Sequence, residues 1–216
     1  MKNKIQVPVV GALLLLVFAI AIVIYNEQKA DELGETANKN ASLLVRDYAP
    51  SIGNRNAKVT IVEFFDPACE TCKAFYPFVK QLMSKYPGKI KLVVRYTPFH
   101  QGSDYVVKML EAARLQNKFW QMLEVTYETQ SVWASHGNPQ PEKLWSLIGG
   151  VGLNLDRARS DMQSATIAQR IQQDMADAQQ LQVTKTPGFF VNGKPLVRFG
   201  YEQLQALVEK EVRSQY

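Results

Sequence analysis

Residues that bind metals or form structural disulfides are scarce in this chain of 216 residues. It contains two cysteines, Cys69 and Cys72, and two histidines, His100 and His136. A structural zinc site needs a full tetrahedral set of ligands, and the histidines lack the sequence spacing of zinc-binding pairs. A framework of several disulfides also needs more cysteines than this. We therefore expect no metal site and no disulfide-stabilised scaffold.

Basic residues are not concentrated in any part of the chain. The formal net charge is +5, but the sequence has no block of lysine or arginine and no basic stripe interleaved with aromatic residues. Because such features mark nucleic-acid-binding proteins, we predict no nucleic-acid partner. Internal repeats and low-complexity tracts are also missing from the sequence. The residues beyond the N-terminal segment suffice for one domain with a substantial core.

Charged residues are absent from residues 5–25, which are long and apolar enough to span a bilayer as a helix. Lys2 and Lys4 precede this run, and acidic residues predominate after it. The positive-inside rule therefore places residues 1–4 in the cytoplasm and the rest of the chain outside. We expect a single-pass anchor of the inner (cytoplasmic) membrane, with residues 5–25 in contact with the lipid bilayer.

A cleaved signal peptide is the alternative interpretation of this segment. Ala19-Ile20-Ala21 resembles a cleavage site with small residues, but the apolar run continues past it, which favours an uncleaved anchor. With either interpretation, the domain that follows faces the periplasm or the cell exterior. Disulfide chemistry persists in such oxidising spaces.

Residues 26–50 are polar and separate the apolar segment from the first strong strand signal. Alanine and leucine recur in them at near-helical spacing, but the stripe that they form is thin. We interpret this segment as a solvated stalk and favour a monomer. A weak helix that oligomerises the chain is the alternative.

The rest of the sequence alternates between strand and helix signals. In chain order, we expect a turn-rich segment at 51–56, a buried strand at 59–65, a helix that begins near Cys69, a second strand at 90–96, a helical block from about 103 to 182, an apolar strand at 188–191 joined to 194–197 by an Asn192-Gly193 turn, and an amphipathic helix at 201–212. Asn-Gly between two apolar runs is a strong hairpin signal. A mixed sheet with helices on both faces satisfies this order.

The two cysteines lie in Cys69-Glu70-Thr71-Cys72, where the first strand gives way to a helix. At the first turn of a helix, unpaired N–H groups and the helix dipole stabilise a thiolate. We therefore predict that Cys69 attacks disulfides and that Cys72, one turn further in, resolves the mixed disulfide. Electrons pass through this pair itself, so thiol–disulfide exchange here needs no organic cofactor and no metal.

Glu63 is an acidic residue on an otherwise apolar strand face. Alternate side chains of a strand point the same way, so Glu63 shares its face with Val59, Ile61 and Phe65. Burial of a carboxylate among such neighbours is costly and keeps it partly protonated. A glutamate whose head reaches solvent at the edge of the sheet is the alternative.

Four segments follow one another along the chain: VTIVEFFDPACETC, FHQGS, KFW and TKTPGFFVNGKPL. Through these segments, in this order, the sequence from about Val45 to the C-terminus resembles the DsbA-like family of thioredoxin-fold thiol:disulfide oxidoreductases. The resemblance implies an α/β thioredoxin fold, with a mixed central sheet and an inserted helical domain. The thioredoxin domain would comprise residues 51–101 and 183–216, and the insertion would comprise residues 102–182.

The resemblance also implies roles for individual residues. Glu63 stands six residues before the first cysteine, where the superfamily has a buried acid that relays protons to the inner thiol. Pro187 corresponds to the cis-proline that faces the two cysteines, and Thr186 corresponds to the residue that hydrogen-bonds an extended substrate. Pro77 corresponds to the proline that kinks the active-site helix.

The expected activity is that of a membrane-anchored extracytoplasmic oxidoreductase, which acts on cysteine-containing client proteins and exchanges electrons with a membrane or periplasmic redox partner. The sequence departs from DsbA between the cysteines, where Glu70-Thr71 replaces Pro-His. A carboxylate beside Cys69 opposes thiolate formation, so we predict a pair that is less oxidising than DsbA. A metal-handling protein that binds through both thiolates and a redox-inactive thioredoxin-fold chaperone are the alternatives.

Overall fold

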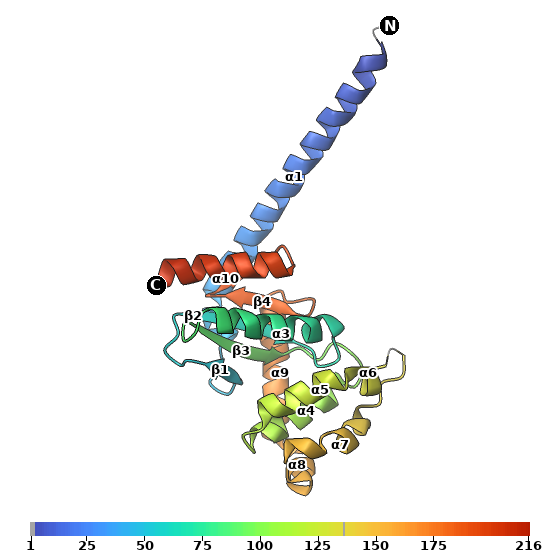
Figure 1. Ribbon diagram of the computed structural model, residues 1–216, viewed down its shortest axis with the longest axis vertical. Helices are drawn as coiled ribbons and strands as arrows, with labels where there is room; N and C mark the ends of the chain where they lie inside the picture. The colour runs from blue at the N-terminus through green and yellow to red at the C-terminus, as the bar shows by residue number, and fades with distance from the viewer. Residues whose placement is uncertain (1–2, 136) are drawn as a thin grey trace.

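The computed structural model describes residues 3–135 and 137–216, with side chains from residue 10 onward. Residues 1–2 of the predicted cytoplasmic segment, and His136, lie outside the described residues. Figure 1 shows helix α1 (Asn3–Lys39) projecting from a body of strands and helices.

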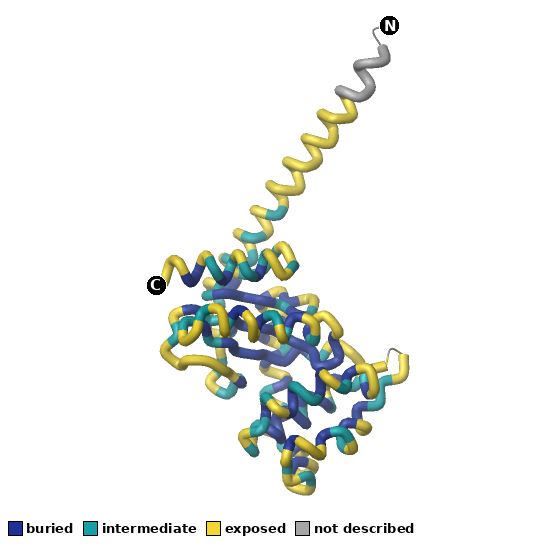
Figure 2. Tube along the Cα trace, in the orientation of Figure 1, coloured by how far each residue is buried: buried dark blue, intermediate teal, exposed yellow. Residues whose placement is uncertain are grey.

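Helix α1 contains the predicted membrane span. Among the described residues, it is the one helix that is long and apolar enough to cross a membrane. Its large apolar residues from Val10 to Tyr25 are exposed. Figure 2 colours the projecting part of the chain as exposed over most of its described length. A continuous apolar surface of this kind is expected for a helix surrounded by lipid rather than by water.

The last turns of α1 and the short helix α2 (Ala41–Leu44) pack on the body. Ala37 and Leu44 are buried in an apolar cluster with Val62 and Phe64 of the sheet. The helix also continues to Lys39 without a break after the apolar run. The segment predicted as a solvated stalk is therefore helical over much of its length and attached to the domain at its C-terminal end.

The body contains a mixed sheet, which confirms the predicted fold class. Its order is β1-β3-β2-β4-β5, with β1 at Ser51–Gly53, β2 at Val59–Phe65, β3 at Ile90–Tyr96, β4 at Gly188–Val191 and β5 at Lys194–Pro195. Strands β2 and β3 are parallel, and the other neighbours are antiparallel. The Asn192-Gly193 turn joins β4 to β5. Strand β1 was missed in the sequence because it is short, and its pairing with β3 is the feature that makes it a strand.

Helices cover both faces of this sheet. Helix α3 (Glu70–Lys85) connects β2 to β3 and contains Pro77, and helix α10 (Tyr201–Gln215) ends the chain. Between β3 and β4 the described residues form helices and no strand. These are α4 (Ser103–Arg114), α5 (Phe119–Glu128), α6 (Gln130–Trp133), α7 (Leu144–Leu147), α8 (Leu155–Asp161) and α9 (Ala165–Gln180), with short 3-10 turns at Pro141–Lys143 and Gly149–Val151.

The side chains of the central strands alternate between two buried faces. On one face, Ile61 and Phe65 pack with α3, α10 and the helical insertion. On the other face, Phe64 packs with the end of α9 and with Leu44. Strands that are buried on both faces are usually continuous apolar runs. Charged residues on β2 and β3 are therefore exceptions that need a physical explanation.

Candidate active site

The two cysteines lie at the junction of β2 and α3. Cys69 is the N-cap residue of α3, and its Sγ accepts a hydrogen bond from the backbone N–H of Cys72 over 3.4 Å. Both residues are free thiols; Cys69 is 7% exposed and Cys72 is fully buried. The N–H groups at a helix start favour negative charge. The fold thus places the first sulfur where a thiolate is stabilised.

The two thiols differ strongly in acidity. Hydrogen bonds with Cys72, with Thr186 and with the backbone of the first helical turn lower the pKa of Cys69 to about 5, although burial opposes this shift. Burial, together with the hydrogen bond to Cys69 and the charge of Glu63, raises the pKa of Cys72 well above its ordinary value. At neutral pH, Cys69 is therefore a thiolate and Cys72 a thiol.

The loop before β4 brings Thr186 and Pro187 to the cysteines. The Thr186–Pro187 peptide bond is cis. The thiol form of Cys69 donates a hydrogen bond to the carbonyl oxygen of Thr186 over 3.3 Å, although the two residues are 117 positions apart in the chain. The residues that the sequence singled out at both ends of the thioredoxin domain therefore meet in one site.

Glu63 is buried in the centre of the sheet near the two thiols. It lies on β2 between Val94 of β3 and Phe189 of β4, and it is 2% exposed. Its Oε1 has no hydrogen-bond partner among the described residues. Burial, and secondarily the charge of Cys69, raises the pKa of Glu63 to about 8. The residue thus carries a proton that it releases just above neutral pH, and it does not reach solvent at a sheet edge.

Asp66 is a site residue that the sequence analysis missed. It follows β2, is fully buried, and accepts a hydrogen bond from the backbone N–H of Ala68 over 2.8 Å. It also accepts from the hydroxyl of Ser103 and from the backbone N–H of His100, whose Nδ1 lies 2.7 Å away. These bonds hold the turn that leads to Cys69 against the start of the helical insertion. The signal in the sequence was an Asp-Pro pair at the end of a buried strand.

A CxxC pair at a strand–helix junction, opposite a cis-proline loop on a mixed sheet, is the arrangement of thioredoxin-fold proteins. Comparison with known proteins agrees with this class. The family described as "Thioredoxin" matches residues 46–210, and the chain belongs to that family. Disulfide bond formation protein D from Bacillus subtilis (strain 168) is 26% identical over 181 residues, which cover 76% of this chain and 77% of that protein.

A solved structure and a longer relative extend the comparison. A thioredoxin-like oxidoreductase from Silicibacter pomeroyi DSS-3 is 29% identical, with a TM-score of 0.68 over 81% of this chain and 98% of that one. The Na(+)/H(+) antiporter NhaA from Herminiimonas arsenicoxydans is 28% identical over 193 residues, which cover 87% of this chain and 30% of that protein. The chain thus spans about 30% of the length of the first curated relatives that it matches. The family match, disulfide bond formation protein D and the thioredoxin-like oxidoreductase confirm the resemblance to DsbA-like oxidoreductases.

Proposed function

We propose that this chain is a membrane-anchored thiol:disulfide oxidoreductase that exchanges disulfides with cysteine-containing proteins outside the cytoplasm. The observation that carries the proposal is the opposite pKa shift of two thiols one helical turn apart, with Cys69 at about 5 and Cys72 well above its ordinary value. Exchange needs one sulfur that attacks and leaves readily as a thiolate, and a second sulfur that remains a thiol until it resolves the mixed disulfide. The names of the relatives, disulfide bond formation protein D and thioredoxin-like oxidoreductase, support the same class.

Oxidation of a client proceeds in two exchanges. A client thiolate attacks Sγ of Cys69, the bond between Cys69 and Cys72 breaks, and Cys72 leaves as a thiolate that takes up a proton. A second client thiolate then attacks the client sulfur of the mixed disulfide, and Cys69 leaves as a thiolate. An electron pair passes from the client to the enzyme, and the same steps in reverse reduce a client.

Glu63 is suited to supply the proton that Cys72 takes up. Its pKa of about 8 keeps it protonated at neutral pH. It also shares a face of β2 with Ile61 and Phe65, which lie in the same buried cluster as both cysteines. A group with a pKa near the working pH transfers protons most effectively. Thr186 and Pro187 border the same site and are suited to hold an extended client segment beside Cys69.

The acidity of Cys69 also bears on the direction of exchange. DsbA, with a thiol pKa of about 3.5, has a potential of about −120 mV, whereas thioredoxin, with a pKa of about 7, has one of about −270 mV. The pKa of Cys69, about 5, falls between the two. The proposal therefore includes a pair that is less oxidising than DsbA and more oxidising than thioredoxin.

Trapping of mixed disulfides tests the proposal. The full chain with Cys72→Ser should accumulate covalent complexes with insulin that disappear on reduction, because Cys69 attacks and nothing resolves the adduct. The Cys69→Ser variant should accumulate none, and non-reducing electrophoresis reads out both. Equal adducts in the two variants would contradict the assigned roles. A redox-inactive chaperone would form no adduct in either variant, and metal analysis of the reduced wild-type protein tests the metal-handling alternative.

A further inference from the structure

A groove of about 620 Å³ lies beside the cysteines, and helix α1 forms part of its wall. Thr71 of α3 and the loop 181–187, which carries the cis-proline, line this groove. Lys29 and Leu33 of α1 line it as well, with residues 188–190 and Pro195 to Val197. The helix that contains the predicted membrane span therefore shares a groove with the cis-proline loop and with Thr71, which lies between the two cysteines in the chain.

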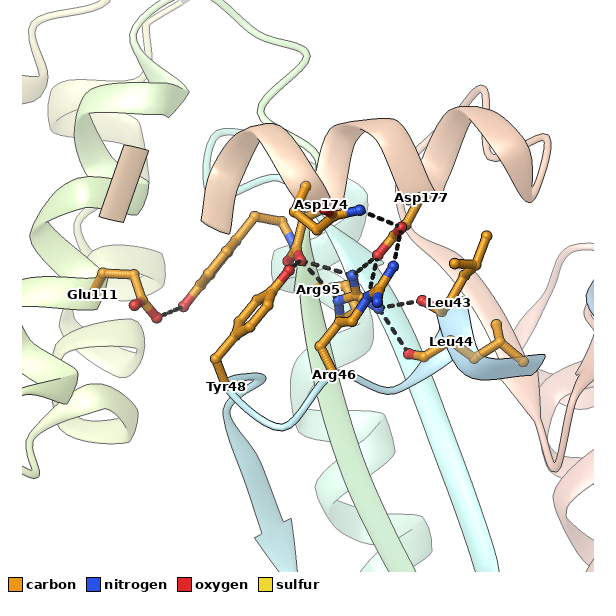
Figure 3. Close-up of polar contacts among 10 residues, drawn as sticks. Leu43, Leu44, Arg46, Tyr48, Arg95, Glu111, Asp174 and Asp177 are labelled. Atoms are coloured by element: carbon orange, nitrogen blue, oxygen red, sulfur yellow. Dashed lines mark hydrogen bonds and ion pairs between the residues drawn. The ribbon is translucent and has the colours of Figure 1, made fainter. Parts of the chain in front are cut away.

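A buried polar network fixes the chain that follows α1 to the sheet, as Figure 3 shows. Arg95 of β3 donates hydrogen bonds to the carbonyl oxygens of Leu43 and Leu44 and pairs with Asp177 of α9. Arg46 binds the same Asp177 with two hydrogen bonds, of 2.8 and 2.7 Å. Because these groups are satisfied inside the protein, the end of α1 is held in one position relative to the sheet.

One face of α1 is also shielded by the body for several turns before this network. Ala37 is fully buried, and Leu33, Ala30 and Asn26 on the same helical face are partly buried. Their spacing of three and four residues is that of one side of a helix. The placement of Lys29 and Leu33 beside the groove thus follows from packing along α1 and does not depend on a single contact.

The charges in the groove have one sign. Among the described residues that line it, the charged ones are Lys29 and Lys185, and both side chains are exposed. They come from different elements, since Lys185 lies in the loop directly before Thr186. The other lining residues are uncharged, and Phe199 adds an apolar surface that is 49% exposed. A groove lined by one sign of charge favours a ligand of the opposite sign.

The groove also lies close to the predicted membrane surface. The predicted span ends at residue 25, and Lys29 and Leu33 follow on the same continuous helix. At a rise of about 1.5 Å per residue, they lie about 6 and 12 Å beyond the end of the span along the helix axis. A client segment that binds this groove therefore lies close to the predicted membrane surface.

We propose that this groove binds an extended client segment with acidic residues next to its reactive cysteine, and that Lys29 and Lys185 select such segments by charge. The inference rests on the proposed oxidoreductase function and names its substrate class. Helix α1 then has two roles: it attaches the protein to the membrane and supplies part of the client-binding surface.

Peptides with two cysteines, flanked by glutamate or by lysine in otherwise identical sequences, test the proposal. Each reduced peptide is mixed with the oxidised full chain in discs of zwitterionic lipid. The peptide thiols form a disulfide while the Cys69–Cys72 disulfide becomes two thiols, and the second-order rate is measured. The ratio of the glutamate-peptide rate to the lysine-peptide rate is compared between wild type and variants. The intrinsic reactivity of each peptide is the same throughout, so a changed ratio reports on charge contacts.

The decisive variant is Lys29→Glu, and its matched control is Lys39→Glu. Lys39 lies on the same helix but pairs with Glu35 and does not line the groove. We expect Lys29→Glu to lower the rate ratio about threefold to tenfold, the range that reversal of an exposed charge contact allows. Salt at about 1 M should remove most of the preference, because the Debye length falls to about 3 Å. Lys39→Glu should retain the wild-type ratio.

Three outcomes would overturn the proposal. An unchanged ratio in Lys29→Glu shows that Lys29 does not contact the client, and an equal loss in Lys39→Glu shows an effect of total charge. A loss that occurs only in discs with anionic lipid identifies Lys29 as a lipid contact. Exchange with glutathione distinguishes failure of the proposed substrate class from failure of the proposed function. Exchange with glutathione without peptide preference rejects the substrate class alone, whereas no exchange with glutathione rejects the proposed function.

Discussion

Two groups of buried ionisable residues lie on opposite faces of β2 and β3, and they differ in whether they have ion-pair partners. On one face, Arg95 donates hydrogen bonds to Asp174 and Asp177 of α9 (Figure 3). Asp174 also accepts a hydrogen bond from Tyr48, and Asp177 accepts two from Arg46. On the other face, one register position away, Glu63 has an oxygen without any partner among the described residues. Both groups are shielded from water to a similar extent.

Ion pairs counteract the effect of burial on protonation to different extents. Burial opposes ionisation of Asp177, but hydrogen bonds from Arg46 and Arg95 outweigh it and lower the pKa of Asp177. At Asp174, burial outweighs the hydrogen bonds from Arg95 and Tyr48 and raises the pKa. Burial also opposes ionisation of Glu63, and with no cation beside it the pKa rises to about 8. A buried acid that is paired with two cations, as Asp177 is, keeps its charge near neutral pH and holds elements together. A buried acid that is unpaired titrates near neutral pH and is available for proton transfer.

Removal of the cation from the paired group should have the largest effect on stability. Arg95→Met leaves Asp174 and Asp177 buried without their shared guanidinium, so we expect the free energy of unfolding to fall by about 3–5 kcal/mol. Chemical denaturation of the reduced protein measures this. Arg213→Met is the control, because Arg213 is exposed and makes a weak ion pair with Glu209, and it should change stability by about 0.5 kcal/mol or less.

A compensating variant sharpens this test. Arg95→Met combined with Asp174→Asn and Asp177→Asn removes the unpaired charges along with the cation, and it should recover part of the lost stability. If the single variant is as stable as wild type, the network does not hold α9 and the α1 end on the sheet. The fixed position of α1 beside the groove would then lose its main support.

Glu63→Gln should raise the free energy of unfolding, whereas Arg95→Met lowers it, and the size of the gain should depend on pH. In the unfolded chain a glutamate has a pKa of about 4.3, and in the folded protein that of Glu63 is about 8. Between these values the folded protein holds a proton that the unfolded chain has released, so the free energy of unfolding falls as the pH rises through this window. Relative to wild type, we expect Glu63→Gln to gain about 3 kcal/mol between about pH 5 and about pH 8 in the reduced protein.

The same variant should slow disulfide exchange. Without the acid near Cys72, we expect exchange at neutral pH to fall by about tenfold or more in stopped-flow measurements. Glu202→Gln is the control, since Glu202 is an exposed acid in the first turn of α10, and its effect should be small and flat over the same pH range. A gain in stability without loss of rate would identify Glu63 as a buried acid that takes no part in the chemistry.

Glu63 and Arg95 also show which features of buried charges could be predicted from the sequence. Alternation along a single strand placed Glu63 on a buried apolar face, because the side-chain period of a strand is a local property. The same rule puts Arg95 on the opposite face, but its partners Asp174 and Asp177 lie about 80 residues later on a helix whose packing is not encoded locally. The presence of a buried arginine could be predicted, but the identity of its partners could not.

The active-site residues also differ in whether they could be predicted from the sequence. Cys69 and Cys72 were located by a local strand–helix junction, and Thr186 and Pro187 by family resemblance. Asp66 was missed because its role depends on Ser103 and His100, which approach it only in the folded chain. The contribution of Lys29 to the groove depends on the packing of α1 against the body, which the thin alanine stripe of the sequence did not reveal.

The smallest effect should come from a charge that is exposed rather than buried. Glu70 lies in the first turn of α3 beside Cys69, and its side chain is exposed. A neighbouring carboxylate opposes the Cys69 thiolate, whereas the histidine that DsbA has between its cysteines favours it. Since solvent screens an exposed charge, we expect replacement of Glu70-Thr71 by Pro-His to raise the reduction potential by only about 30 mV, equivalent to about 1.4 kcal/mol, and to lower the pKa of Cys69 with it.

Glutathione redox buffers measure the potential, and the pH dependence of thiolate absorbance measures the pKa of Cys69. Glu70→Gln is the matched control, because it removes the negative charge without adding a histidine and should give a part of the same shift. A wild-type potential at or above the DsbA value of about −120 mV would contradict the argument from Glu70. Control of the thiolate would then rest with the hydrogen bonds that Cys69 makes with Cys72, Thr186 and the first helical turn, which are the contacts that lower its pKa to about 5 against the effect of burial.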